Sequence, residues 1–108
     1  MKFLTITKPS GVAPPFEMVP ALFEAHKAWL DKHRASGRIT HVWFFGGQPA
    51  GAGIAEVDSA EQLDELFADF PWRPWSFLEH HALSDADTAL ATYLAATKAQ
   101  LEMMQQQG

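Results

Sequence analysis

The stretch "ITHVWFFGGQPAGAGIAEV", residues 39–57, decides how this chain folds. Residues 39–45 are β-branched and aromatic, which favours a well-buried strand at the centre of a sheet. Residues 51–57 favour a second strand, and the glycines between the two indicate a turn. A phosphate-binding loop would need a helix directly after its glycines, so that backbone N–H groups and the helix dipole meet the anion. A strand follows instead, so the stretch predicts a β-hairpin.

The rest of the chain places further strands and helices around this hairpin. Apolar residues recur at three- and four-residue spacing where helices are expected, and alternation marks the strands. The expected elements are a strand over residues 2–8, a helix over 16–36 that stops at Gly37, a helix that starts at Ser59 with Gln62 completing a capping box, a strand over 76–83, and a helix capped by Ser84.

The order β-α-β-β-α-β predicts an α+β fold of the ferredoxin-like type, a four-stranded antiparallel sheet with helices on one face. Residues 1–83 would form this domain, and residues 84–108 a C-terminal helical extension of the same domain. Leu90, Leu94, Thr97 and Leu101 fall on one face of that helix, so it is expected to pack on something.

The strand at residues 39–45 is apolar on both faces. Alternation sets Thr40, Val42 and Phe44 on one side and Ile39, Trp43 and Phe45 on the other. One domain of this kind cannot cover both faces of its sheet. A homodimer formed sheet against sheet is therefore expected. Gly51 and Gly53 in the next strand indicate a bulge or a close approach to the backbone.

Composition excludes several classes of function. The chain has 108 residues, a formal net charge of -5 and only eight lysines and arginines, which argues against nucleic acid and anionic membranes as partners. It has no cysteine, so disulfides, thiolate metal sites and cysteine nucleophiles are excluded. No segment approaches the ~20 apolar residues that span a bilayer, and no signal peptide is visible, so a cytoplasmic protein is expected.

His26 is the most informative of the five histidines. The first helix places it between Leu22 and Trp29 on the apolar face, where burial favours the neutral imidazole and suits a general base. The alternative is a core histidine that hydrogen-bonds a backbone carbonyl. His33, one heptad later, is expected to be partly exposed at the helix end.

Two further groups are candidates for proton transfer or orientation. His41 lies on the same side of its strand as Trp43, and Glu79 shares a face with His81 in the last strand. The alternative for Glu79 is a rim position on an edge strand. His80 and His81 must face opposite ways, and no histidine pair has the spacing of a helical zinc site, so no metal is expected.

The stretch "FPWRPW", residues 70–75, combines two tryptophans with two prolines in a stiff, apolar wall. Trp72 and Trp75, together with Trp43, would shape a ligand pocket. Arg73 is the one cation between them and could hold a carboxylate. The alternative is a packed surface loop with a solvated arginine.

Two of these stretches resemble the muconolactone delta-isomerase family of dimeric α+β barrels. Gly37 followed by His41-Val42-Trp43 is similar to a family motif in residue type and spacing, and so is the proline-tryptophan segment continuing to Leu78-Glu79 and Leu83. The resemblance spans residues 3–83. A family carboxylate of the first helix, a candidate acid/base, corresponds to His26 in this chain.

The resemblance implies a cofactor-free isomerase that moves a proton on an unsaturated lactone or related acid through an enolate, in a homodimer or a higher oligomer of dimers. The catalytic residues would be His26, His41 and Glu79. The small-molecule substrate would be bound by Trp43, Trp72, Arg73 and Trp75. Two alternatives stay open: a cofactor-free oxygenase or cyclase of aromatic or polyketide substrates, and a non-catalytic ligand-binding module.

Overall fold

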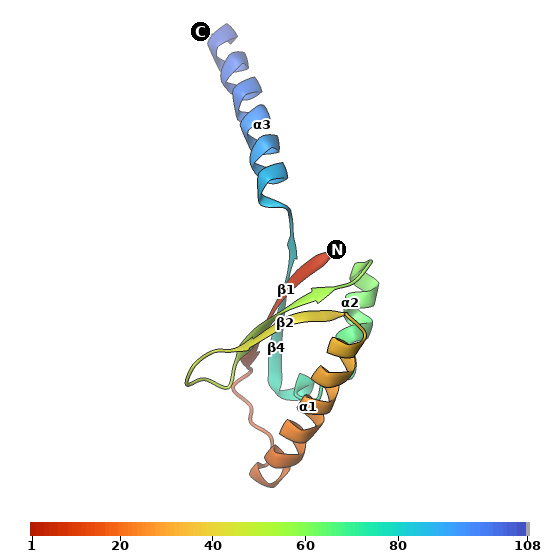
Figure 1. Cartoon of the computed structure of the whole chain (residues 1–108). Helices are drawn as coiled ribbons and strands as arrows, with labels where there is room; N and C mark the ends of the chain where they lie inside the picture. The colour runs from red at the N-terminus through yellow and green to blue at the C-terminus, as the bar shows by residue number, and fades with distance from the viewer. Residues whose placement is uncertain (108) are drawn as a thin grey trace.

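The computed structural model describes residues 1–107 and contains a four-stranded sheet, two helices that cover one of its faces, and a third helix that extends away from it (Figure 1). The elements are β1 (Lys2–Pro9), the short 3₁₀ turn η1 (Phe16–Met18), α1 (Val19–Ala35), β2 (Ile39–Phe44), β3 (Gly51–Glu56), α2 (Ala60–Phe67), the 3₁₀ turn η2 (Arg73–Trp75), β4 (Ser76–Leu83) and α3 (Ala86–Gln107).

The strand order is β2-β3-β1-β4, and every neighbouring pair is antiparallel. This is the strand order of a ferredoxin-like β-α-β-β-α-β unit, because each helix crosses over one strand before the chain returns to the sheet. The predicted fold class is confirmed.

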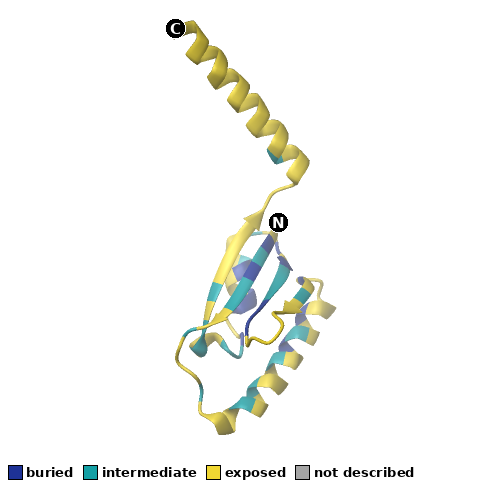
Figure 2. Cartoon of the chain, turned by 90° about the vertical axis from the view of Figure 1, so that its left-hand side faces the viewer, coloured by how far each residue is buried: buried dark blue, intermediate teal, exposed yellow. Residues whose placement is uncertain are grey.

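The core lies between the sheet and the two helices α1 and α2. Leu66 of α2 is fully buried, and Trp29 of α1 packs near it against the aromatic rings of Phe67 and Phe70. The buried residues lie in the body of the molecule and none lies on α3 (Figure 2). α2 begins as predicted, since the backbone N–H of Gln62 donates to Ser59 Oγ at 3.2 Å.

Gly37 ends α1 as expected. Its φ is 79°, in the left-handed region that glycine adopts without strain. The N–H of Gly37 donates to the carbonyl of Arg34, and the N–H of Arg38 donates to that of His33. This pattern is a Schellman motif, which satisfies the last carbonyls of the helix.

β2 differs from the prediction in two ways. It is an edge strand rather than a central one. A bulge between Ile39 and His41 also shifts the alternation, so that Ile39, Val42 and Phe44 face the helices and His41 and Trp43 face the other side. The expected grouping of Ile39 with Trp43 is therefore wrong.

The glycines of β3 allow the backbone of β2 to approach closely. A Cβ added at Gly51 would lie 2.5 Å from the carbonyl oxygen of Trp43, and one at Gly53 would lie 3.0 Å from that of His41. Of the two expectations for these glycines, the close approach is confirmed, whereas the bulge lies in β2 between Ile39 and His41 and not at the glycines.

The face of the sheet that points away from α1 and α2 is called the open face here. Its side chains include Trp43 and Phe77, which are 53% and 65% exposed, together with Leu83 at 44%. The expected full burial of the strand around Trp43 is thus not found in a single chain. No element of the described chain, residues 1–107, covers this face.

α3 buries no residue, and the molecule measures 69 × 31 × 25 Å because this helix projects from the body (Figures 1 and 2). Leu90 and Leu94 are 66% and 57% exposed, so the stripe packs on nothing within one copy. The cap predicted at Ser84 is wrong. Asp85 caps the helix instead, since its carboxylate accepts hydrogen bonds from the N–H and the hydroxyl of Thr88.

Candidate functional site

A cavity of about 430 Å³ is lined by residues of α1, the loop before it, the β2–β3 hairpin and η2. Sites for small molecules typically measure roughly 300–1,000 Å³. A smaller hollow of about 50 Å³ lies between α1 and the sheet. Thr7, His26, Phe44 and Phe70 line both, so these four residues stand where the two spaces meet.

His26 is the titratable residue of the larger cavity. It is half-buried on the core-facing side of α1, as its position in the helix predicts. Its ring lies 5.3 Å from that of Phe70, edge to face, and 5.8 Å from that of Phe44. The imidazole of His26 is thus flanked by two apolar rings, one from β2 and one from the segment after α2.

Burial lowers the pKa of His26 below its ordinary value, because an apolar surrounding disfavours the imidazolium. The hydrogen bonds of residues 1–107 include none to either ring nitrogen of His26, and neither nitrogen is fully enclosed. The alternative of a core histidine tied to a backbone carbonyl is not observed. A neutral imidazole with an accessible lone pair is the form that accepts a proton.

The proline-tryptophan segment forms one wall of the cavity. Trp72 and Trp75 are both in the lining, and the ring of Phe23 lies 4.9 Å from that of Trp72. Arg73 is not in the lining. Its guanidinium Nη1 donates to the carbonyl of Phe67 at 3.0 Å, which ties it to the end of α2.

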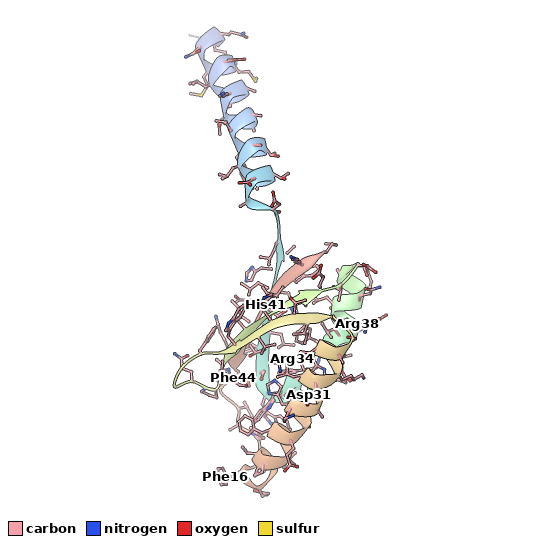
Figure 3. All side chains as sticks on the ribbon, viewed as in Figure 1. Phe16, Asp31, Arg34, Arg38, His41 and Phe44 are labelled. Atoms are coloured by element: carbon pink, nitrogen blue, oxygen red, sulfur yellow. The ribbon has the colours of Figure 1, made fainter. Side chains whose placement is uncertain are left out.

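The side chains of His41 and Trp43 lie on the open face, and Trp43 also borders the smaller hollow that His26 lines. Their rings stack at 5.7 Å with an interplanar angle of 17°, and His41 Nδ1 is 3.1 Å from Thr40 Oγ1. Phe44 belongs to the same strand but faces the helices; the side chains of His41 and Phe44 can be followed in Figure 3. One chain therefore does not bring His41 into the cavity.

Glu79 also lies on the open face, across the sheet from His26. Its carboxylate is 3.0 Å from His81 Nε2 and 3.6 Å from Lys8 Nζ. The hydrogen bond from His81 and then the charge of Lys8 hold the pKa of Glu79 below its ordinary value. The predicted pairing of Glu79 with His81 on one face is confirmed.

Two other histidines take structural positions. His33 is buried rather than partly exposed, because the end of α1 packs against the loop after α2, and its Nε2 is 3.9 Å from Asp69 Oδ1. His80 faces the helices, with Nδ1 2.8 Å from the hydroxyl of the buried Thr5. No group of three or more metal-ligating side chains occurs among residues 1–107.

The sequence pattern did not single out Phe44 and Ser76 as parts of a site, whereas Phe70 belongs to the aromatic segment that it did single out. Phe44 reaches the cavity because the bulge in β2 reverses its alternation, and no sequence signal marks that bulge. Ser76 lies in the lining at the start of β4, directly after Trp75. Its place next to the tryptophan wall is the one signal that could have identified it.

Comparison with known proteins gives one consistent result. The family model described as muconolactone delta-isomerase matches residues 1–87. The muconolactone delta-isomerase of Acinetobacter baylyi (strain ATCC 33305 / BD413 / ADP1) is 26% identical over 73 residues, which cover 68% of this chain and 76% of that protein. A crystal structure of muconolactone isomerase matches with a TM-score of 0.65 at 22% identity, over 79% of this chain and 90% of that one.

At 22% identity, the structural match shows a shared fold. α3 lies almost wholly beyond the matched residues. Within the described residues, no helix has the length and apolar character that crossing a membrane requires.

Proposed function

This chain belongs to the muconolactone delta-isomerase family, and from that premise we propose that it is a cofactor-free isomerase that shifts a proton along an unsaturated lactone or a related acid or carbonyl compound. Family membership supports an isomerase-type function. The observation that carries the proposal is the half-buried His26, free of protein hydrogen bonds, in a cavity large enough for a small ring compound.

His26 is the proposed acid/base. The neutral imidazole removes a proton from the carbon next to the carbonyl or the double bond, and the electron pair moves into the conjugated system as a dienolate. The imidazolium then returns a proton to the other end of that system. One base suffices because both carbons lie in the same small ring, and the double bond moves with no net gain or loss of atoms.

The aromatic side chains support this chemistry by excluding water. Phe44, Phe70 and Trp72 surround the space in front of His26, and a dry site strengthens every electrostatic interaction with the dienolate. The enolate oxygen also needs a hydrogen-bond donor. Ser76 is the proposed donor, since its hydroxyl makes no hydrogen bond within residues 1–107, whereas Thr7 already donates to the carbonyl of Gly51.

The residues of the open face do not reach His26 within one chain. His41, Trp43 and Glu79 all lie on the face that one chain leaves uncovered. We propose that two copies pack sheet against sheet, which would cover Trp43 and Phe77 in an apolar interface.

Proton NMR in heavy water tests the proposed reaction. The full chain is incubated with muconolactone and, separately, with its methyl ester, and deuterium entry and movement of the double bond are followed. Isomerisation of either compound above the buffer rate supports the proposal. Absence of isomerisation and of exchange with both compounds would overturn it.

A cofactor-free oxygenase is the second candidate. The aromatic walls formed by Phe23, Phe44 and Trp72 suit a flat ring, which such enzymes oxidise. Oxygen consumption in the presence of an aromatic ketone or phenol separates this reaction from isomerisation, since a proton shift consumes no oxygen.

A further inference from the structure

The larger cavity contains no charged side chain. Its polar lining side chains are Thr7, His26 and Ser76, and the other side chains of the lining are apolar or aromatic. The chain has eight lysines and arginines, and none of them is in the lining of either hollow.

The nearby cations are engaged elsewhere. Arg73, which follows Trp72 in the wall, donates to the carbonyl of Phe67. Lys8 lies on the open face beside Glu79, and Lys27 binds Asp31 at 2.8 Å on the outer surface of α1. No lysine or arginine within residues 1–107 is thus placed to receive a carboxylate inside the cavity.

We propose that the cavity takes an uncharged ring compound, a lactone, ketone or ester, rather than a carboxylate. An ionised carboxylate taken from water into an apolar cavity loses its hydration, and it is accepted only where a cation or several N–H donors replace that loss. A carbonyl oxygen needs a single donor, which Ser76 can supply. The inference rests on the proposed function, because it names the substrate class of that same site.

Binding of a matched pair of probes tests this inference without requiring turnover. Naphthyl methyl ketone and naphthoate have the same ring system and nearly the same size, and differ in carrying an acetyl group or a carboxylate. Titration calorimetry on the full chain at pH 8 gives both dissociation constants. Shifts of the His26 ring protons in NMR spectra place the ligand in the cavity.

The ketone is expected to bind at least about tenfold more tightly than the carboxylate, since burial of an unpaired charge is costly. Val12 lies at the cavity and is exposed, so the body should tolerate substitution there. Val12→Lys is expected to raise naphthoate affinity by about two- to fivefold. Its neutral control, Val12→Met, should leave the ratio of the two affinities unchanged.

Naphthoate binding as tight as that of the ketone would overturn the inference, and so would the failure of the ketone to bind at the cavity. Neither result depends on isomerisation. The proposed reaction fails separately, when muconolactone and its methyl ester both stay unchanged in heavy water.

Discussion

The ring of His26 on α1 meets the ring of Phe70 edge-on, with centroids 5.3 Å apart, at the inner end of the cavity. Phe70 comes from the segment after α2, so the contact joins two elements that are distant in sequence. It helps to bury the imidazole, and burial lowers the pKa of His26 below its ordinary value. The lowered pKa favours the neutral imidazole, which is the form that accepts a proton.

The pH profile of kcat/KM should report His26. Burial lowers its pKa, so the proton-accepting form persists below the ordinary value of about 6.5. Activity is expected to be constant above pH 7 and to fall tenfold per pH unit on the acid side, with a midpoint below about 6.5. An uncharged substrate keeps the profile free of substrate titration. A midpoint above that value would contradict the assignment.

The open face should hold two copies together. Trp43→Asp places a charge in the proposed sheet-to-sheet interface and is expected to convert dimers into monomers in sedimentation-velocity experiments. The matched control is Phe16→Asp, because Phe16 is 85% exposed on η1 and lies outside the sheet. Loss of the dimer in both variants, or in neither, would contradict this interface.

Because β2 approaches β3 closely, adding one methyl group at Gly51 should lower the stability of the protein. Gly51→Ala forces a Cβ against the carbonyl oxygen of Trp43, and a loss of about 1–3 kcal/mol in the free energy of unfolding is expected. Gly46→Ala is the control, since no heavy atom lies within 4 Å of an added Cβ there and its φ is not positive. Urea denaturation of both variants gives the difference. Equal losses would refute the close approach.

Leu66 and Leu101 should differ sharply in their contribution to stability. Leu66→Ala removes a fully buried side chain and is expected to lower the free energy of unfolding by about 2–5 kcal/mol. Leu101 is 55% exposed on α3, so Leu101→Ala should change it by less than about 0.5 kcal/mol in a monomeric sample. A large loss at Leu101 would mean that α3 packs on the body or on another copy.

The order of the elements could be predicted from the sequence because each carries a local signal. The hairpin of residues 39–57 has β-branched and aromatic flanks around its glycines, and Gly37 and Ser59 mark helix ends. The position of β2 at the sheet edge could not be predicted, since both of its faces are apolar in either position. Burial of the strand's second face depends on a partner that one sequence does not show.

The candidate site could be predicted only in part. His26 and Trp72 lie where helix periodicity and the proline-tryptophan segment place them. His41 and Phe44 exchange faces relative to simple alternation because the bulge after Ile39 adds one residue to β2. Which candidates share a cavity depends on such register shifts, and these are set by contacts between strands rather than by local sequence.

The central claim is that His26 moves the proton, and comparison of wild type with His26→Gln tests it most directly. Glutamine keeps a polar group of similar size but cannot act as a base, and equal melting temperatures would establish that the variant is folded. Isomerisation and deuterium entry, followed by NMR in heavy water with the better of the two lactone substrates, are expected to fall by about 10²- to 10⁴-fold in the variant. An unchanged rate in a folded His26→Gln protein would contradict the account.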